Sequence, residues 1–301
     1  MVFKTNKTNY FFLGLLLVVA ILIWLAVFAQ VPSHLLEVNF YDVGQGEAIF
    51  IETPNGHQVL IDGGPEATIL EKLGQELPFY DRSIDLVICT HPETDHLNGL
   101  IEVLKYYQVE QILTTGFERH IPEYQEWLRI IKEKQIPVKI AQAGQVIYLG
   151  ENIKMKILWP EPSLIDCLAK PPAQNFWCGG KSSNNASIVT QLIYGQREFL
   201  LTGDIERETE LYLATHLSAS QLESDVLKIA HHGSQTSTNQ FFLQVVNPSI
   251  AIISAGRDNP YGHPHLQVLE RLAGIKVYRT DEDGDIEILT DGVLIEIRTN
   301  K

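Results

Sequence analysis

The first strongly apolar stretch of the chain covers residues 10–29, where twenty residues in succession carry no charge. In a helix such a run reaches roughly 30 Å, the hydrocarbon thickness of a bilayer. Lys4 and Lys7 precede it, and the next Lys or Arg is Lys72. By the positive-inside rule this asymmetry predicts a transmembrane signal anchor in contact with the lipid bilayer, with a short cytoplasmic N-terminus over residues 1–9 and the rest of the chain outside the cytoplasm. The alternative is a signal peptide cleaved near the small residues Val27 and Ala29.

Beyond a linker over residues 30–36, the hydrophobic pattern becomes one of short runs rich in β-branched residues. LEVNFYDV, EAIFIETP and HQVLIDGG follow one another with only turn residues between them, which predicts three consecutive antiparallel strands. Amphipathic helices and apolar strands then mix through the middle of the chain, and two last strands meet at Asp291-Gly292. Residues 37–301 are therefore expected to form one α/β (α+β) domain with two mixed sheets packed face to face and helices outside. A doubly wound sheet is disfavoured, because no helices separate the first three strands.

Composition narrows the function classes. The formal net charge is −14, which argues against a broad basic surface for nucleic acid. Bound metal ions can still supply positive charge locally, so phosphate substrates stay open. Three cysteines occur: Cys89 lies in the apolar run LVICT and is expected to be buried, whereas Cys167 and Cys178 flank a Pro-containing loop. A disulfide between the last two and a pair of unrelated thiols are both compatible with this spacing.

The strongest chemical signal is the sequence His91-Pro92-Glu93-Thr94-Asp95-His96, between an apolar strand and a helix. Imidazoles and carboxylates are the usual ligands of zinc and manganese. At such a turn His91 and Glu93 can face one metal ion, and Asp95 and His96 a second. A solvated polar loop would rarely gather four potential ligands within six residues.

Further ligand types follow other apolar strands. FLLTGD ends at Asp204, which could bridge two ions, although a Gly-Asp pair alone is usually a turn or cap. LKIAHHGS carries His231 and His232, and YGHPH carries His263 and His265. Six of the ten histidines thus fall in three clusters, which predicts a common site.

These motifs resemble the metallo-β-lactamase superfamily, whose H-x-H-x-D-H signature is similar to HPETDH. DVGQGEA, LIDGG, NNASIV, LLTGDIE, LKIAHHGSQTS, YGHPH and YRTDEDG together resemble the hydrolase domain of ComEC-type competence proteins. The resemblance covers residues 38–290 and implies an αββα sandwich with a dinuclear site at one edge. It implies no channel, because the multi-helix region of full competence proteins has no counterpart here.

The resemblance also implies roles for individual residues. His91 and Glu93 would serve one metal ion, Asp95 and His96 the other, and Asp204 would bridge them. The remaining ligands would be His232 and His263, with His231 and His265 as alternatives that could instead contact substrate. Asp62 of LIDGG would orient a ligand histidine from behind.

Two departures from the superfamily pattern affect the first metal position. Glu93 stands where many members carry His, and Asn184-Asn185-Ala186-Ser187 stands where many carry a separate ligand His before the bridging Asp. Oxygen-rich sites suit manganese as well as zinc, so the expected cofactors are two divalent ions, Zn²⁺ or Mn²⁺.

The expected chemistry is hydrolysis by a metal-activated water, with Asp95 orienting the nucleophile and His231 or His265 protonating the leaving group. Ser234, Thr236 and Ser237 are expected to cap the next helix, or else to hold a phosphate oxygen. By resemblance the substrate is a phosphodiester, with DNA among the candidates. The alternatives are a lactone, lactam or thioester hydrolase on the same fold and a non-catalytic, metal-stabilised binding protein. No sequence feature indicates a protein partner.

Overall fold

The computed structural model describes residues 7–28, 35–161 and 183–301, so Cys167 and Cys178 lie outside the described residues. The chain divides into two compact units, Met1–His34 and Leu35–Lys301. The domain limits and linker expected from the sequence remain predictions.

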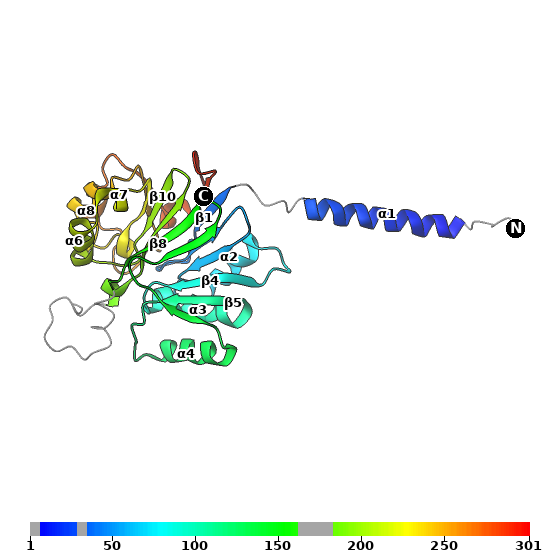
Figure 1. The fold of residues 1–301 in the computed structure, drawn as a ribbon, viewed down its shortest axis with the longest axis horizontal. Coiled ribbons are helices and arrows are strands. Elements are labelled where there is room, and N and C mark those ends of the chain that lie inside the picture. Colours follow the sequence, from blue (N-terminus) through cyan, green and yellow to red (C-terminus); the bar gives the residue numbers. More distant parts are fainter. Residues whose placement is uncertain (1–6, 29–34, 162–182) are drawn as a thin grey trace. The chain divides into compact units, whose positions relative to one another are not determined.

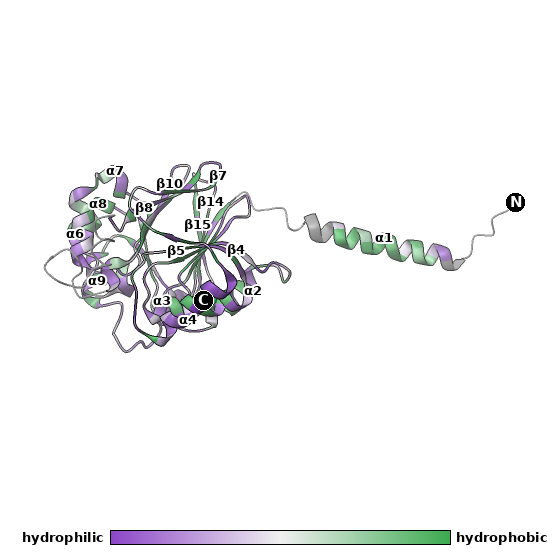
Figure 2. Cartoon of the chain, turned by 60° about the horizontal axis from the view of Figure 1, so that its bottom comes forward, coloured by the Kyte–Doolittle hydropathy of each residue, from purple (hydrophilic) through white to green (hydrophobic). Residues whose placement is uncertain are grey.

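The first unit contains one helix, α1 (Lys7–Phe28), of 22 residues. Large apolar side chains along it, from Tyr10 to Trp24, are exposed, and Figure 2 shows the hydrophobic residues around it. Within the described part of the chain, no helix meets the combined length and apolarity that crossing a bilayer demands. The transmembrane span predicted over residues 10–29 is therefore not confirmed.

The second unit contains two sheets (Figure 1). One has eight strands in the order β15-β14-β1-β2-β3-β4-β5-β6. Its strands are β1 (Leu36–Phe40), β2 (Ile49–Glu52), β3 (Gln58–Ile61), β4 (Ser83–Cys89), β5 (Gln108–Thr114), β6 (Val138–Ile140), β14 (Ile286–Thr290) and β15 (Ile295–Thr299). The other has seven strands in the order β13-β12-β11-β10-β9-β8-β7. Its strands are β7 (Val146–Gly150), β8 (Ile153–Trp159), β9 (Val189–Tyr194), β10 (Arg197–Leu201), β11 (Val226–Lys228), β12 (Ile250–Ile253) and β13 (Lys276–Arg279).

Alternation along the strands explains why helices cover both outer faces. In β2, Ile49 and Ile51 join the core between the sheets, whereas Phe50 points to the other side and packs with the helices of the first sheet. Figure 1 shows α2–α4 with the first sheet and α6–α8 with the second. The helices are α2 (Thr68–Glu76), α3 (Thr94–Tyr106), α4 (Pro122–Lys134), α6 (Arg207–His216), α7 (Ala219–Leu222), α8 (Gln240–Val246), α9 (Leu266–Arg271) and α10 (Thr280–Asp283). The predicted αββα arrangement is confirmed, as are the three consecutive strands β1–β3, which pair antiparallel.

Parallel pairing brings the candidate ligands together. β3 pairs parallel with β4, and β10 pairs parallel with β11, which pairs parallel with β12. The carboxyl ends of parallel neighbours meet at one edge of a sheet, where ligands commonly bind. HPETDH follows β4, Asp204 follows β10 and the HHG histidines follow β11. All three motifs therefore lie at the carboxyl ends of their strands.

Candidate active site

The turn between β4 and α3 brings two histidines together. β4 ends at Cys89, and α3 begins at Thr94 with the extended Glu93 as its N-cap. His91 and His96 are fully buried, and their ring centroids lie 4.2 Å apart. The two histidines of the motif that gave the strongest sequence signal therefore lie against each other.

Asp62, directly after β3, holds this turn from behind. Its buried carboxylate accepts hydrogen bonds from His96 Nδ1 at 2.7 Å, from the Thr90 backbone N–H at 2.8 Å and from Thr90 Oγ1 at 2.6 Å. Because Nδ1 of His96 donates to a carboxylate, its Nε2 is the nitrogen left to bind a ligand. Asp62 thus contacts His96 from behind, and its role in orienting a metal ligand remains a prediction.

Asp204 reaches the same place from the second sheet. It follows β10 through Thr202-Gly203, and its backbone N–H donates to Ser187 Oγ at 3.1 Å. Its Oδ2 lies 3.3 Å from Nε2 of His96 and 3.2 Å from Nε2 of His232. A single carboxylate oxygen therefore joins imidazoles that come from different sheets.

The backbone after β11 explains which of the adjacent histidines turns inward. His231 and His232 both have left-handed φ values, 51° and 55°, which non-glycine residues seldom adopt. His232 is buried and its Nδ1 donates to the backbone carbonyl of Ser254 at 2.8 Å, leaving Nε2 to face Asp95 at 3.5 Å. Gly233 lets the chain pass Pro264, because a Cβ on Gly233 would lie 2.6 Å from that ring.

Four of these side chains form a cluster that suits a cation. Single ligand atoms of Asp95, His96, Asp204 and His232 all lie within 4.8 Å of one another. Several buried polar atoms here have no hydrogen-bond partner, namely Nε2 of His91, His96 and His232, Oδ1 of Asp204 and Nδ1 of His263. A buried polar atom without a partner costs about 1–3 kcal/mol, so native proteins seldom gather several in one place. The donor set therefore fits divalent ions.

The pKa values of the site residues also suit the binding of a cation. Burial and the neighbouring His96 lower the pKa of His91 to about 3, so His91 stays a neutral imidazole that can bind a cation. Burial raises the pKa of Asp204, but the imidazoles of His232 and His96 outweigh that effect and hold it well below its usual value. The pKa of Asp95 is also lowered, since His96 and His232 outweigh its burial. Both carboxylates are thus ionised at neutral pH.

Glu93 lies differently from the other residues of its motif. Its carboxylate pairs with Arg119 and accepts a hydrogen bond from Ser183 Oγ. The structure does not bring it into the four-residue cluster, so its role as a metal ligand remains a prediction. Arg119 holds this carboxylate from the segment between β5 and α4.

The other predicted histidines line the rim. His231 is partly exposed, with Nδ1 3.1 Å from Thr236 Oγ1 and Nε2 3.3 Å from Asn184 Nδ2. The ring of His263 lies 6.4 Å from that of His232, and that of His265 lies 5.2 Å from His263. Burial, together with His232, lowers the pKa of His263 to about 4. All three remain candidates for the roles predicted above.

The capping role expected of Ser234, Thr236 or Ser237 is wrong. α8 begins at Gln240, and the side chain of Asn239 caps it by accepting a hydrogen bond from the Phe241 N–H. The three hydroxyls instead stabilise the loop after HHG. Ser237 donates to the carbonyls of Ala230 and Ser234, and Thr236 contacts His231 and Ser234.

Sequence reasoning missed three residues beside the cluster. Ser187 Oγ lies 3.2 Å from His91 Nδ1 and also accepts from the Asp204 backbone, and it belongs to the Asn-Asn-Ala-Ser stretch noted above as a departure. Glu47 and Lys228 form a buried ion pair, and Lys228 Nζ lies 3.7 Å from Asp204 Oδ1. A charged residue at the end of the otherwise apolar strand VLK was the available signal for Lys228.

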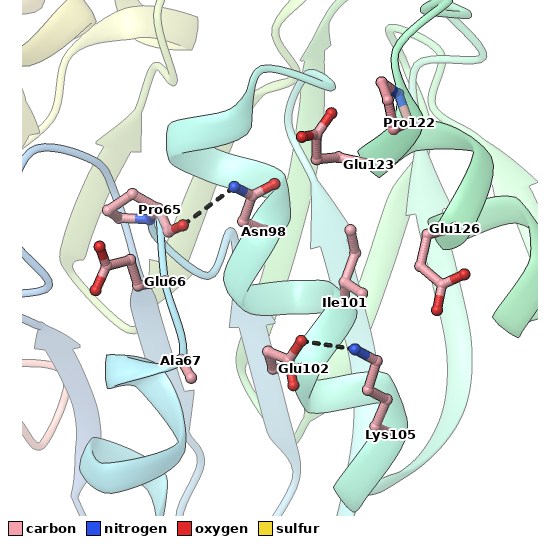
Figure 3. Close-up of a pocket in the computed structure, with 10 residues that line it drawn as sticks. All are labelled: Pro65, Glu66, Ala67, Asn98, Ile101, Glu102, Lys105, Pro122, Glu123 and Glu126. Carbon is pink, nitrogen blue, oxygen red and sulfur yellow. Dashed lines mark hydrogen bonds and ion pairs between the residues drawn. The ribbon is translucent and has the colours of Figure 1, made fainter.

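A separate groove of about 440 Å³ lies between the segment that directly precedes α2 and the helices α3 and α4 (Figure 3). Pro65, Ala67 and Ile101 supply its apolar surface, and most of its charged side chains are acidic. Two of these already have partners, because Glu102 pairs with Lys105 and Glu126 with Arg129. None of its lining residues belongs to the four-residue cluster, so the groove is not the candidate active site.

Comparison with known proteins agrees with this geometry. Residues 41–165 match the profile of the Metallo-beta-lactamase superfamily. ComE operon protein 3 of Bacillus subtilis (strain 168) is 32% identical over 271 residues, which cover 83% of this chain and 32% of that protein. Recombination protein 2 of Haemophilus influenzae is 29% identical over 272 residues, which cover 87% of this chain and 30% of that protein.

The chain thus spans about a third of the length of these curated relatives. Among solved structures, Igni18 of Ignicoccus hospitalis KIN4/I, described as a novel metallo hydrolase, gives a TM-score of 0.52 at 13% identity. The match covers 83% of this chain and 98% of Igni18. At that identity the likeness shows a shared fold and nothing more.

Proposed function

The chain carries a metal-dependent hydrolase domain of the metallo-β-lactamase superfamily like that of ComEC-type competence proteins, and from this premise we propose that it hydrolyses phosphodiesters. The observation that carries the proposal is the cluster of Asp95, His96, Asp204 and His232 with its unpartnered nitrogen and oxygen atoms. When bound, divalent ions lower the pKa of water and polarise the scissile ester. His91 and His263, together with Glu93 as the sequence motif predicts, would complete the ligand set for two ions, Zn²⁺ or Mn²⁺.

The charge of the pocket supports an anionic substrate. Besides Asp95 and Asp204, it holds the buried Asp62 and the buried pair of Glu47 and Lys228. Divalent ions held here would displace the protons from the imidazoles of His96 and His232, and their charge beside the carboxylates of Asp95 and Asp204 would attract an anion such as a phosphodiester.

The chain's own residues supply the remaining functions. Asp95 is the most exposed member of the cluster and faces His232, which places it to orient the attacking water. His231 lies at the rim, where its imidazole can donate a proton to the leaving oxygen; His265 is the alternative donor. One relative is named for recombination, a process that acts on nucleic acid, so DNA is a candidate substrate. The overall charge of −14 favours a small or locally held phosphodiester over a long duplex.

Activity on model esters tests the proposal. The purified chain, loaded with Mn²⁺ or Zn²⁺, is expected to hydrolyse bis-p-nitrophenyl phosphate, and plasmid DNA more slowly, but not nitrocefin. Asp95→Ala should reduce the phosphodiester rate by roughly 10²-fold or more, because a positioned catalytic group contributes about 10²–10⁴-fold.

Turnover of nitrocefin alone would replace the proposal with lactam hydrolysis. Two bound ions without turnover of any ester would favour the non-catalytic binding protein.

We also propose that residues 10–29 anchor the chain in a membrane with residues 37–301 outside the cytoplasm. The support is the uncharged run and the helix α1, whose 22 residues would extend about 33 Å. The full chain is expected in the membrane fraction, and its hydrolase domain should be digested by protease added outside intact cells. Removing residues 1–29 should move the protein to the soluble fraction; a full chain that is already in the soluble fraction contradicts the anchor.

A further inference from the structure

A buried ion pair connects the two sheets directly behind the cluster. Glu47 lies between β1 and β2 of the first sheet, and Lys228 ends β11 of the second. The two side chains are 1% and 0% exposed, and Lys228 Nζ contacts Glu47 Oε2. The function proposed above assigns neither residue a role beyond its charge.

The ammonium of Lys228 lies close to Asp204 but not within hydrogen-bonding distance. Nζ donates a hydrogen bond to the backbone carbonyl of Gly203 at 3.2 Å, but it lies 3.7 Å from Asp204 Oδ1. That distance exceeds a hydrogen bond, and Oδ1 has no hydrogen-bond partner. Asp204 therefore keeps one carboxylate oxygen uncommitted although the amino group of Lys228 lies beside it. Burial lowers the pKa of Lys228 to about 7, whereas the contact with the Glu47 carboxylate favours the ammonium form.

The backbone of Glu47 fixes where its carboxylate can reach. Its N–H donates to the carbonyl of Asp95 at 3.2 Å, and its own carbonyl accepts from the Gly64 N–H at 2.8 Å. The neighbouring Gly46 permits this approach, because a Cβ there would lie 2.3 Å from the Asp95 carbonyl oxygen. Glu47 is thus tied to the turn that carries Asp95 and His96.

A buried ammonium that loses its carboxylate is strongly destabilised, so it moves to the nearest remaining anion or loses its proton. Within reach of Lys228 that anion is Asp204. An ammonium hydrogen-bonded to Oδ1 would occupy the lone pairs that a cation needs, and its charge would repel the cation as well.

We propose that Glu47 is a positioning residue of the metal centre: by anchoring the ammonium of Lys228, it keeps Oδ1 of Asp204 available to a cation. The inference rests on the metal site of the proposed function and extends that site by two residues.

Zinc affinity in a set of variants tests this role without any assay of activity. Competition with a chromophoric chelator would give the Zn²⁺ dissociation constant of the full chain, Glu47→Gln, Lys228→Met and the double variant. Glu47→Gln is expected to weaken binding by about 10–100-fold, the usual effect of losing a residue that supports a ligand. Adding Lys228→Met removes the competing ammonium and should return the affinity to within about threefold of the wild type.

Asp225→Asn is the matched control, because Asp225 pairs with Arg197 and contacts no member of the cluster. It should leave the affinity for Zn²⁺ unchanged even if it lowers stability. If Glu47→Gln does not fold, Glu47→Asp with and without Lys228→Met supplies the same comparison, and the second change must again restore binding.

A double variant that binds as weakly as Glu47→Gln would show a general structural role and overturn the inference. Wild-type affinity in Glu47→Gln would also overturn it. A wild-type chain that binds no Zn²⁺ would overturn the proposed metal site and this inference together, so the two failures are distinguishable.

Discussion

Asp204→Asn is expected to abolish metal-dependent hydrolysis, lowering kcat/KM for bis-p-nitrophenyl phosphate by at least about 10³-fold. The substitution keeps the shape of the side chain but removes its charge and replaces one oxygen with an NH₂ group that cannot bind a cation. Oδ2 of Asp204 lies within 3.3 Å of both His96 and His232, and Oδ1 is unpartnered, so replacing either oxygen would remove an atom that could bind a cation. If Asp204 bridges two ions, as its position in the sequence motif predicts, the substitution should affect both of them.

Two measurements on the same sample check this expectation: the number of ions bound per chain by mass spectrometry of the metals, and the steady-state rate. Asp285→Asn is the control, since it makes the same carboxylate-to-amide change at a partly buried residue that pairs with Lys72 outside the cluster. We expect two ions and full activity in the control, and fewer than one ion in Asp204→Asn. Two tightly bound ions and a rate within tenfold of the wild type would show that Asp204 is not a bridging ligand.

The convergence of the cluster could be predicted because it depends on a rule that holds for strands in general. β10 and β11 are parallel neighbours, so the groups following Leu201 and Lys228 must lie side by side. The apolar runs that predict these strands also fix where they end. The turn after β4 is part of the same pattern in the other sheet, and the αββα arrangement follows from helices that need to cover both outer faces.

Other features depend on contacts that no local pattern contains. The pattern HPETDH suggests that Glu93 is a ligand, yet Arg119 pairs with it from a segment 26 residues further along the chain. Two successive residues with left-handed φ values determine which of His231 and His232 points into the cluster. The sequence HHG does not predict this backbone conformation. Asn239 caps α8, because the Ser237 hydroxyl of the preceding loop already donates to a backbone carbonyl within that loop.

The burial of Lys228 is a further feature that the sequence does not predict. A lone lysine in a strand normally marks an edge or a solvated face, and its burial becomes understandable only when Glu47, about 180 residues earlier, is placed against it. Charge pairs of this kind form only when the two sheets pack together. The sequence therefore shows both residues but does not show that they pair.

Gly99→Ala is expected to destabilise the fold by about 3 kcal/mol or more, although alanine normally stabilises a helix relative to glycine. Gly99 lies in α3, one turn after His96, and a Cβ there would meet the carbonyl oxygen of Gly63 at 1.8 Å. The two backbones are also hydrogen-bonded, because the N–H of Gly63 donates to the His96 carbonyl at 2.8 Å and the N–H of Gly99 donates to the Gly64 carbonyl at 2.9 Å. Neither backbone can retreat without breaking these bonds and moving Asp62 away from His96.

Gly74→Ala is expected to have the opposite effect on the stability of the same domain. Gly74 lies in α2 and has open space around it, so alanine there should raise the free energy of unfolding by about 0.5–1 kcal/mol. Urea unfolding of the metal-free protein, followed by circular dichroism, would measure both variants against the wild type. If Gly99→Ala were as stable as Gly74→Ala, the close approach of α3 to the LIDGG turn would be wrong, and so would the placement of Asp62 behind His96. Because the two substitutions are chemically identical, a difference in sign can come only from what surrounds each glycine.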